Sequence, residues 1–130
     1  MPPDLKSQST AISNRIAALH REHYGRGAGR VRTIIHRDYV STLLDDPYTP
    51  VERLAIANGE FRGVREMRTM FQDWMRVPFT EAVEEATGRS VHAFFSQNSA
   101  EPRMSLEFFV LEPLLADAEG GGLAEPVAAV

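Results

Sequence analysis

The same order of predicted elements occurs twice along this chain: a helix, a Gly-Arg pair and then two strands. In the first half, apolar residues at helical spacing predict a helix over residues 9–24, with Ser9 or Thr10 as its N-cap. The β-branched and aromatic run that follows predicts a hairpin over residues 31–46, turning near residues 37–38.

The second half opens with a helix start signal at residues 49–52, where Thr, Pro and Glu form a capping box with proline in the first turn. This short helix is expected to stop at residues 58–59. A long helix is predicted over residues 60–87, with a kink or break at Pro78, where a backbone donor is missing. Gly88 is expected to end that helix.

Two further strands are predicted over residues 90–95 and 104–113, joined by a polar loop over residues 96–103. The resulting order predicts an α+β fold: two helix–hairpin halves forming one antiparallel sheet with helices packed on one face. The strands are apolar on both sides, since Phe108 and Phe109 point to opposite faces.

The helices can cover only one of these two sheet faces. The second face has three candidate covers: the short helix over residues 50–57, the chain after Pro113, or another protein molecule. Both segments are short, and large exposed apolar patches usually mark an interface. We therefore expect a homodimer or higher oligomer, with closed two-fold symmetry as the default.

Composition limits the class of protein and its domain organisation. The 130 residues fit one domain over residues 10–115, with a flexible N-terminus (residues 1–9) and a flexible Gly-, Ala- and Pro-rich tail (residues 116–130). The chain has no cysteine, which excludes thiolate chemistry and suits the cytoplasm. No apolar run could span a bilayer, so any membrane association is expected to be peripheral and through a partner. The net charge of −4 argues against nucleic-acid binding.

The stretch "YGRGAGRVR" brings one tyrosine and three arginines together with three glycines. It closes a helix and opens a strand, which is the reverse of the order in phosphate-binding glycine loops. One interpretation is a glycine C-cap with a flexible joint. The other is an anion or partner-binding site formed by Tyr24, Arg26, Arg30 and Arg32, because guanidinium groups suit bicarbonate, phosphate or a partner's carboxylates.

Other candidate chemistry is weaker. His20 and His23 are three residues apart on one helix, but no third ligand is evident, so no metal site is predicted. No catalytic constellation and no cofactor are predicted either. Trp74 lies in a Met-aromatic stripe that is more typical of a core. An enzyme would have its site in a helix–sheet cleft near Trp74 and His92.

Four short motifs resemble the MpsC family of small bacterial domains: "YGRGA" at residues 24–28, "YTPVER" at 48–53, "EATGR" at 85–89 and "FVLEP" at 109–113. The resemblance covers about residues 12–113. It implies the small soluble component of a sodium-translocating, membrane-potential-generating system whose membrane subunits are linked to cation and inorganic-carbon uptake. The family supplies no catalytic residues.

The expected function is therefore a non-enzymatic accessory or regulatory domain that binds membrane transport subunits or a small anion. A small enzyme or ligand-binding protein is the alternative. The loop over residues 96–103 reads "SQNSAEPR" where similar proteins read like "SDxHxDPD", and it keeps only Glu101 of their acidic and histidine side chains. If that loop binds a cation or partner in similar proteins, this chain has lost or altered the ability.

Overall fold

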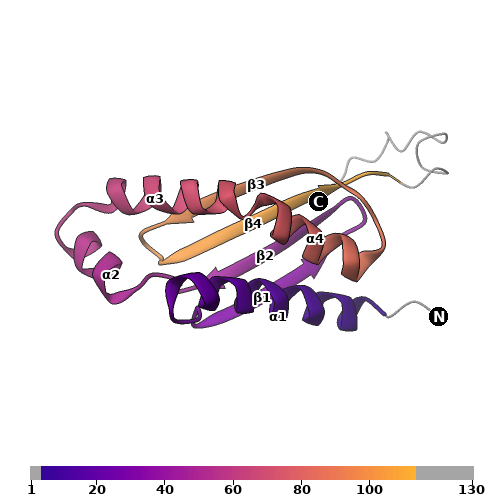
Figure 1. Ribbon diagram of the computed structural model, residues 1–130, viewed down its shortest axis with the longest axis horizontal. Coiled ribbons are helices and arrows are strands. Elements are labelled where there is room, and N and C mark those ends of the chain that lie inside the picture. The colour runs from indigo at the N-terminus through magenta and orange to yellow at the C-terminus, as the bar shows by residue number, and fades with distance from the viewer. Residues whose placement is uncertain (1–3, 114–130) are drawn as a thin grey trace.

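The computed structural model of the chain describes residues 4–113, which form a layer of helices on one face of a four-stranded antiparallel sheet (Figure 1). The elements in chain order are α1 (Leu5–Tyr24), β1 (Arg30–Ile35), β2 (Tyr39–Asp45), α2 (Pro50–Ala57), α3 (Phe61–Trp74), α4 (Arg76–Thr87), β3 (Val91–Ser99) and β4 (Met104–Leu111). The predicted α+β fold is confirmed. Residues 116–130, predicted to be a tail, lie outside the described residues.

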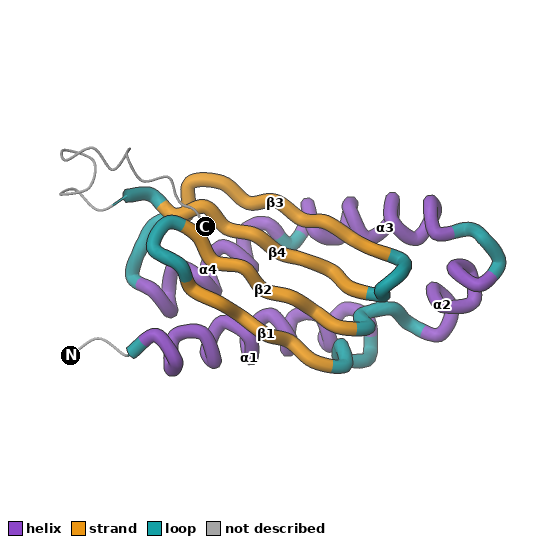
Figure 2. Tube along the Cα trace, turned by 180° about the vertical axis from the view of Figure 1, so that it is seen from behind, coloured by secondary structure: helices purple, strands orange, loops and turns teal. Residues whose placement is uncertain are grey.

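The two hairpins join at the centre of the sheet, whose strand order is β1-β2-β4-β3. β2 pairs with β4 along its whole length, and Val40 lies opposite Phe109 near one end of this pairing. Helices α1, α3 and α4 lie across one face, whereas the strands are in front of them when the molecule is seen from behind (Figures 1 and 2). The short helix α2 lies at one end of the molecule and does not cover the second face (Figure 2).

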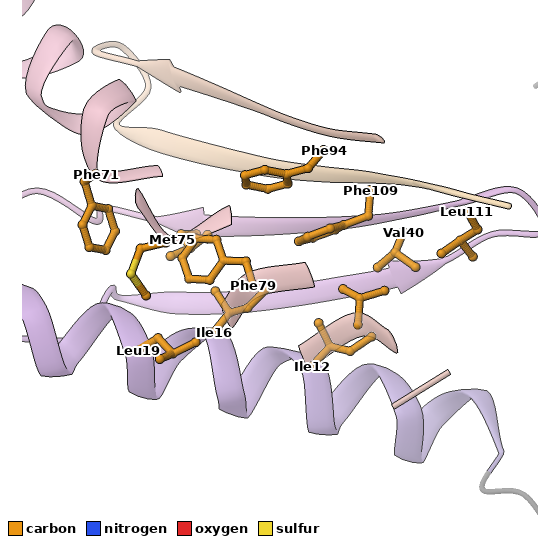
Figure 3. Packing of buried hydrophobic residues seen from close by; sticks show 12 residues of the cluster. Ile12, Ile16, Leu19, Val40, Phe71, Met75, Phe79, Phe94, Phe109 and Leu111 are labelled. Carbon is orange, nitrogen blue, oxygen red and sulfur yellow. The ribbon is translucent and has the colours of Figure 1, made fainter. Parts of the chain in front are cut away.

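The hydrophobic core lies between the sheet and the three long helices (Figure 3). From α1, Ile12 and Ile16 are fully buried because their spacing places them on one face of the helix. They belong to one cluster with Val40 and Phe109, a cross-strand pair on the two central strands that is also fully buried. Phe79 of α4 fills the space between the helices and the aromatic ring of Phe94.

Helix α1 begins at Leu5, four residues before the predicted start at residue 9, so it includes part of the segment that was expected to be a flexible N-terminus. The N-cap is Asp4, not Ser9 or Thr10, and its carboxylate accepts a hydrogen bond from the Ser7 amide at 2.8 Å.

The predicted long helix is two helices, α3 and α4, divided at Met75. The break was expected at Pro78, which instead lies in the first turn of α4. A proline ring clashes with the carbonyl four residues before it, here that of Trp74, so the chain must leave helical geometry ahead of the proline. Inside the first turn of α4 the missing donor is harmless, because those amides lack intrahelical partners.

Strand β3 runs through Ser99, so the prediction of a loop over residues 96–103 is wrong for its first half. Ser96 and Asn98 stay in the strand because their side chains bond to polar groups between the sheet and α3. A register shift between Val91 and Ala93 turns Val91 towards the core.

Candidate functional site

A buried arginine forms the centre of a polar joint between α1, α2 and α3. Arg68 is 2% exposed and forms a fork-to-fork pair with Glu52, with Nε donating to Oε2 at 2.8 Å and Nη2 to Oε1 at 2.5 Å. Its Nη2 also donates to the Pro47 carbonyl at 2.7 Å. Burial alone would raise the pKa of Glu52, but hydrogen bonds from Arg68 and Thr49 outweigh it and lower that pKa.

Glu52 has this position because it belongs to the predicted capping box, which the structure confirms. The Thr49 hydroxyl accepts from the Glu52 amide at 3.2 Å, and Glu52 accepts from the Thr49 amide at 2.8 Å. One carboxylate therefore caps α2 and neutralises Arg68.

His20 of α1 completes the joint. Its Nε2 lies 2.7 Å from Arg68 Nη1, and its Nδ1 lies 3.2 Å from the Arg26 carbonyl. Since the guanidinium can only donate, the ring accepts at Nε2 and donates from Nδ1, so His20 is neutral. Burial and the charge of Arg68 lower its pKa to about 4. His20 is thus a structural residue, and the exposed His23 does not share a site with it.

Tyr24 packs its ring against the same guanidinium group, with Arg68 Cζ 3.7 Å from the ring centroid. Burial raises the pKa of Tyr24 to about 12. Arg26 Nη1 donates to the Tyr48 carbonyl at 2.5 Å. Arg26 therefore holds the "YTPVER" segment directly, whereas Tyr24 contacts Arg68, which pairs with Glu52 of that segment.

The other two motifs are joined in the same way at the opposite end of the sheet. Arg89 of "EATGR" donates to the Arg37 carbonyl at 2.5 Å and to the Glu112 carbonyl, within "FVLEP", at 2.9 Å. Gly88 ends α4 with φ of 72°, a left-handed conformation that suits glycine. The motifs that carry the family resemblance thus form two joints that fix the helices to the sheet.

A second buried network lies between α3 and the β4–β3 hairpin. Glu107 is 2% exposed and accepts from Ser96 Oγ at 2.5 Å and from Gln72 Nε2 at 2.8 Å. Gln72 and Asn98 exchange two amide hydrogen bonds, at 3.1 and 2.9 Å. Burial raises the pKa of Glu107 to about 7, although Ser96, Gln72 and the charge of Arg68 oppose that rise.

Arg68 and Glu107 were not predicted from the sequence to be internal charges. Glu107 could have been found, because Ser105, Phe109 and Leu111 share its side of the strand and that side faces the core. Arg68 is harder to find, since charged residues at helical positions are usually solvated.

The four residues of the predicted anion or partner site do not form one cluster. Tyr24 and Arg26 belong to the joint described above. Arg30 and Arg32 are exposed on the sheet face that carries no helix among residues 4–113. Arg32 pairs with Asp45 across the hairpin, with Nη2 and Oδ1 3.3 Å apart. The glycine C-cap interpretation holds at Gly25, whose φ is 78°.

Of the two residues of the predicted cleft, Trp74 and His92, only His92 lines the hollow of about 360 Å³ that lies between α4 and β3. His92, Glu81, Arg76 and Glu84 are among its lining residues, and the Glu84 carboxylate accepts a hydrogen bond from the Val91 amide at 2.8 Å. Trp74 is not among the lining residues.

Trp74 instead belongs to an exposed apolar stripe, which we call the α3–α4 stripe. Its members are Met67, Met70, Trp74 and Val77, which are between 47% and 66% exposed. Their spacing of three or four residues places them on one side of the helical layer, away from the buried Phe71. The prediction that the Met-aromatic stripe belongs to the core is wrong for Met67, Met70 and Trp74, because α3 is apolar on two sides.

Within the part of the chain that the structure describes, no group of three or more His, Asp or Glu side chains could hold a metal ion. Over the same residues, no helix has the length and hydropathy needed to cross a membrane.

The structure defines a two-layer α+β domain made of two helix–hairpin halves, fixed by polar joints and apolar on part of both outer surfaces. The chain belongs to the MpsC family: residues 6–113 match the family model described as "Na+-translocating membrane potential-generating system (MpsC)". No curated protein and no solved structure matches the chain.

Proposed function

We propose that this protein is a non-enzymatic accessory subunit of a sodium-translocating, membrane-potential-generating system. It acts at the cytoplasmic face by binding a membrane subunit of that system. Family membership supports the system, and the α3–α4 stripe supports the mode of action. Exchange of cations or inorganic carbon is the task of the membrane subunits in this proposal, and the accessory subunit regulates or assembles them.

The α3–α4 stripe carries the proposal. Trp and Met are enriched in the cores of protein interfaces, where a large side chain enters a pocket of the partner. Trp74 is 66% exposed at the middle of the stripe. Charged side chains border it, including the exposed pairs Arg62–Glu66 at 3.6 Å and Arg76–Asp73 at 3.2 Å. An apolar centre with a charged rim is the usual anatomy of a reversible interface.

Arg30 and Arg32 supply a second contact in this proposal. They are exposed near the start of the first hairpin and suit acidic side chains of the partner, or a small anion such as bicarbonate. Tyr24 and Arg26 contribute by holding the joint behind them.

Sedimentation with membrane vesicles tests the proposal. Inverted vesicles from cells that express the system should bind the purified protein, and Trp74→Asp should weaken this binding at least about tenfold, since a charge would be buried. Leu5→Asp is the matched control, because Leu5 is 60% exposed at the far end of α1.

Two results would contradict the proposal. Equal binding of the wild type and Trp74→Asp would exclude the stripe as the contact. Equal binding to protein-free lipid vesicles would show that the membrane, and not a membrane subunit, is recognised.

A further inference from the structure

The sheet face opposite the helices has an apolar centre that nothing covers among residues 4–113. We call it the outer sheet face. Side chains alternate along each strand, so the residues between the buried ones point outward. The apolar members are Ile34, Leu43, Phe95, Leu106, Phe108 and Val110. Phe95 is 59% exposed and Ile34 is 55% exposed.

Aromatic side chains of this face stack on one another. The rings of Tyr39 and Phe108 are stacked with centroids 4.9 Å apart, and His36 stacks on Tyr39 at 4.2 Å. Phe95 is the cross-strand neighbour of Phe108 in the β3–β4 register. Two β-sheets that pack face to face lie about 10 Å apart.

Charge on the outer sheet face is confined to one edge. The outward residues of β3 and β4 are all uncharged, whereas Arg30, Arg32 and Asp45 lie on β1 and the adjoining end of β2. Arg32 and Asp45 lie 3.3 Å apart across the hairpin and both stay partly exposed at this edge. A partner that covers β4 and β3 therefore meets no charge that needs a counter-ion, and the charged edge becomes a solvated rim.

The size of the face suits a small, stable interface. Four strands about 4.8 Å apart give a width of about 19 Å. The eight residues of β4, at about 3.3 Å each, give a length of about 26 Å. The projected area is about 500 Å² per protomer before side-chain relief is counted, so two protomers would bury about 1,000 Å² in total, the lower limit for a specific interface.

We infer that the outer sheet face binds a second copy of this chain, and that the two sheets pack face to face about a two-fold axis. A second copy fits because its face is equally uncharged at the centre, so neither protomer buries an unpaired charge. The helical layers then lie on the outside of the dimer, with both α3–α4 stripes accessible. This inference does not depend on the binding of a membrane subunit.

Light scattering after size exclusion tests the inference at micromolar concentration and physiological salt. The expected mass is about 29 kDa, twice the 14.5 kDa of one chain. Phe95→Asp should raise the dimer dissociation constant at least about tenfold, because a carboxylate would enter an apolar contact. Trp74→Asp is the matched control on the opposite layer and should leave the mass unchanged. Circular dichroism shows whether each variant is folded.

Spin labels give a second, independent readout. The chain has no cysteine, so a single introduced cysteine is unique. Labels at Gln97→Cys on the outer sheet face should be closer together in the dimer than labels at Thr69→Cys on the exposed side of α3.

Three results would overturn the inference: a wild-type monomer of 14.5 kDa, a dimer unaffected by both Phe95→Asp and Leu106→Asp, or closer labels on α3. A monomer would mean that the chain after Pro113 or a different protein covers the outer sheet face. Loss of the dimer in Phe95→Asp with membrane binding retained would separate this surface from the α3–α4 stripe.

Discussion

Glu107→Gln should change how the stability of this protein depends on pH. Burial raises the pKa of Glu107 from 4.5 to about 7, so the folded protein keeps a proton that the unfolded chain releases. The contribution of Glu107 to the free energy of unfolding is largest below pH 4.5, and this contribution falls as the pH rises towards 7. At about 1.4 kcal/mol per unit, this loss amounts to about 3 kcal/mol for the full shift.

His20 acts in the opposite direction. Its pKa falls from 6.5 to about 4 on folding, so between these pH values His20 is protonated in the unfolded chain and neutral in the folded protein. The free energy of unfolding therefore falls by about 3 kcal/mol as the pH decreases from 6.5 to 4. The two effects nearly cancel between pH 4.5 and 6.5.

The glutamine variant removes one of these opposing effects. Glutamine has the same shape, and its carbonyl can still accept from Gln72. The difference in unfolding free energy, variant minus wild type, should increase by about 3 kcal/mol between pH 4.5 and 7. His20→Gln should show a difference that decreases by a similar amount between pH 4 and 6.5.

Urea denaturation followed by far-ultraviolet circular dichroism, at fixed ionic strength and protein concentration, measures these differences. Other titrating groups contribute equally to the variant and the wild type, so they cancel. A constant difference for Glu107→Gln across this pH range would show that the carboxyl titrates alike in both states. That result would refute the burial of Glu107 in its protonated form between α3 and the β3–β4 hairpin.

Three further predictions concern the joints and the helix ends. Arg68→Ala should cost about 3–5 kcal/mol in urea denaturation, because it leaves a largely buried carboxylate unpaired; a cost below about 1 kcal/mol would show that the pair is solvated. Gly63 lies inside α3 with open space around it, so Gly63→Ala should raise the unfolding free energy by about 0.5–1 kcal/mol. Gly88 has a φ of 72°, so Gly88→Ala should lower the unfolding free energy by about 1 kcal/mol. Changes of the same sign in the two variants would contradict this prediction. Arg26→Ala should cost about 1 kcal/mol through the lost bond to a buried carbonyl, and Arg30→Ala should be neutral by the same assay; equal effects would place both side chains in solvent.

Much of the fold could be predicted because its signals are local. The capping box of α2, the turn between β1 and β2 and the glycine at the end of α4 each depend on a few neighbouring residues. The position of the α3–α4 break was predicted less well. Pro78 indicates that a break is needed, but the clash occurs with the preceding turn, which moved the division to Met75.

The candidate site was less predictable, because burial is not a local property. The arginines of "YGRGAGRVR" look equivalent in the sequence, yet Arg26 reaches a backbone carbonyl of a distant segment while Arg30 remains exposed. Trp74 and Phe71 occupy similar positions in one apolar pattern, and only the rotation of α3 on the sheet decides which of them is buried.

Periodicity, capping and turn residues act over a few positions, so the elements, their order and the α+β class follow from the sequence. Which charges became internal depends on how distant segments pack together. Arg68, Glu52 and His20 come from three different helices, and Glu107 faces Gln72 across the layer between sheet and helices. Their pKa values and exposures arise from the desolvation and pairing that packing imposes, and those quantities exist only once distant segments have been brought together.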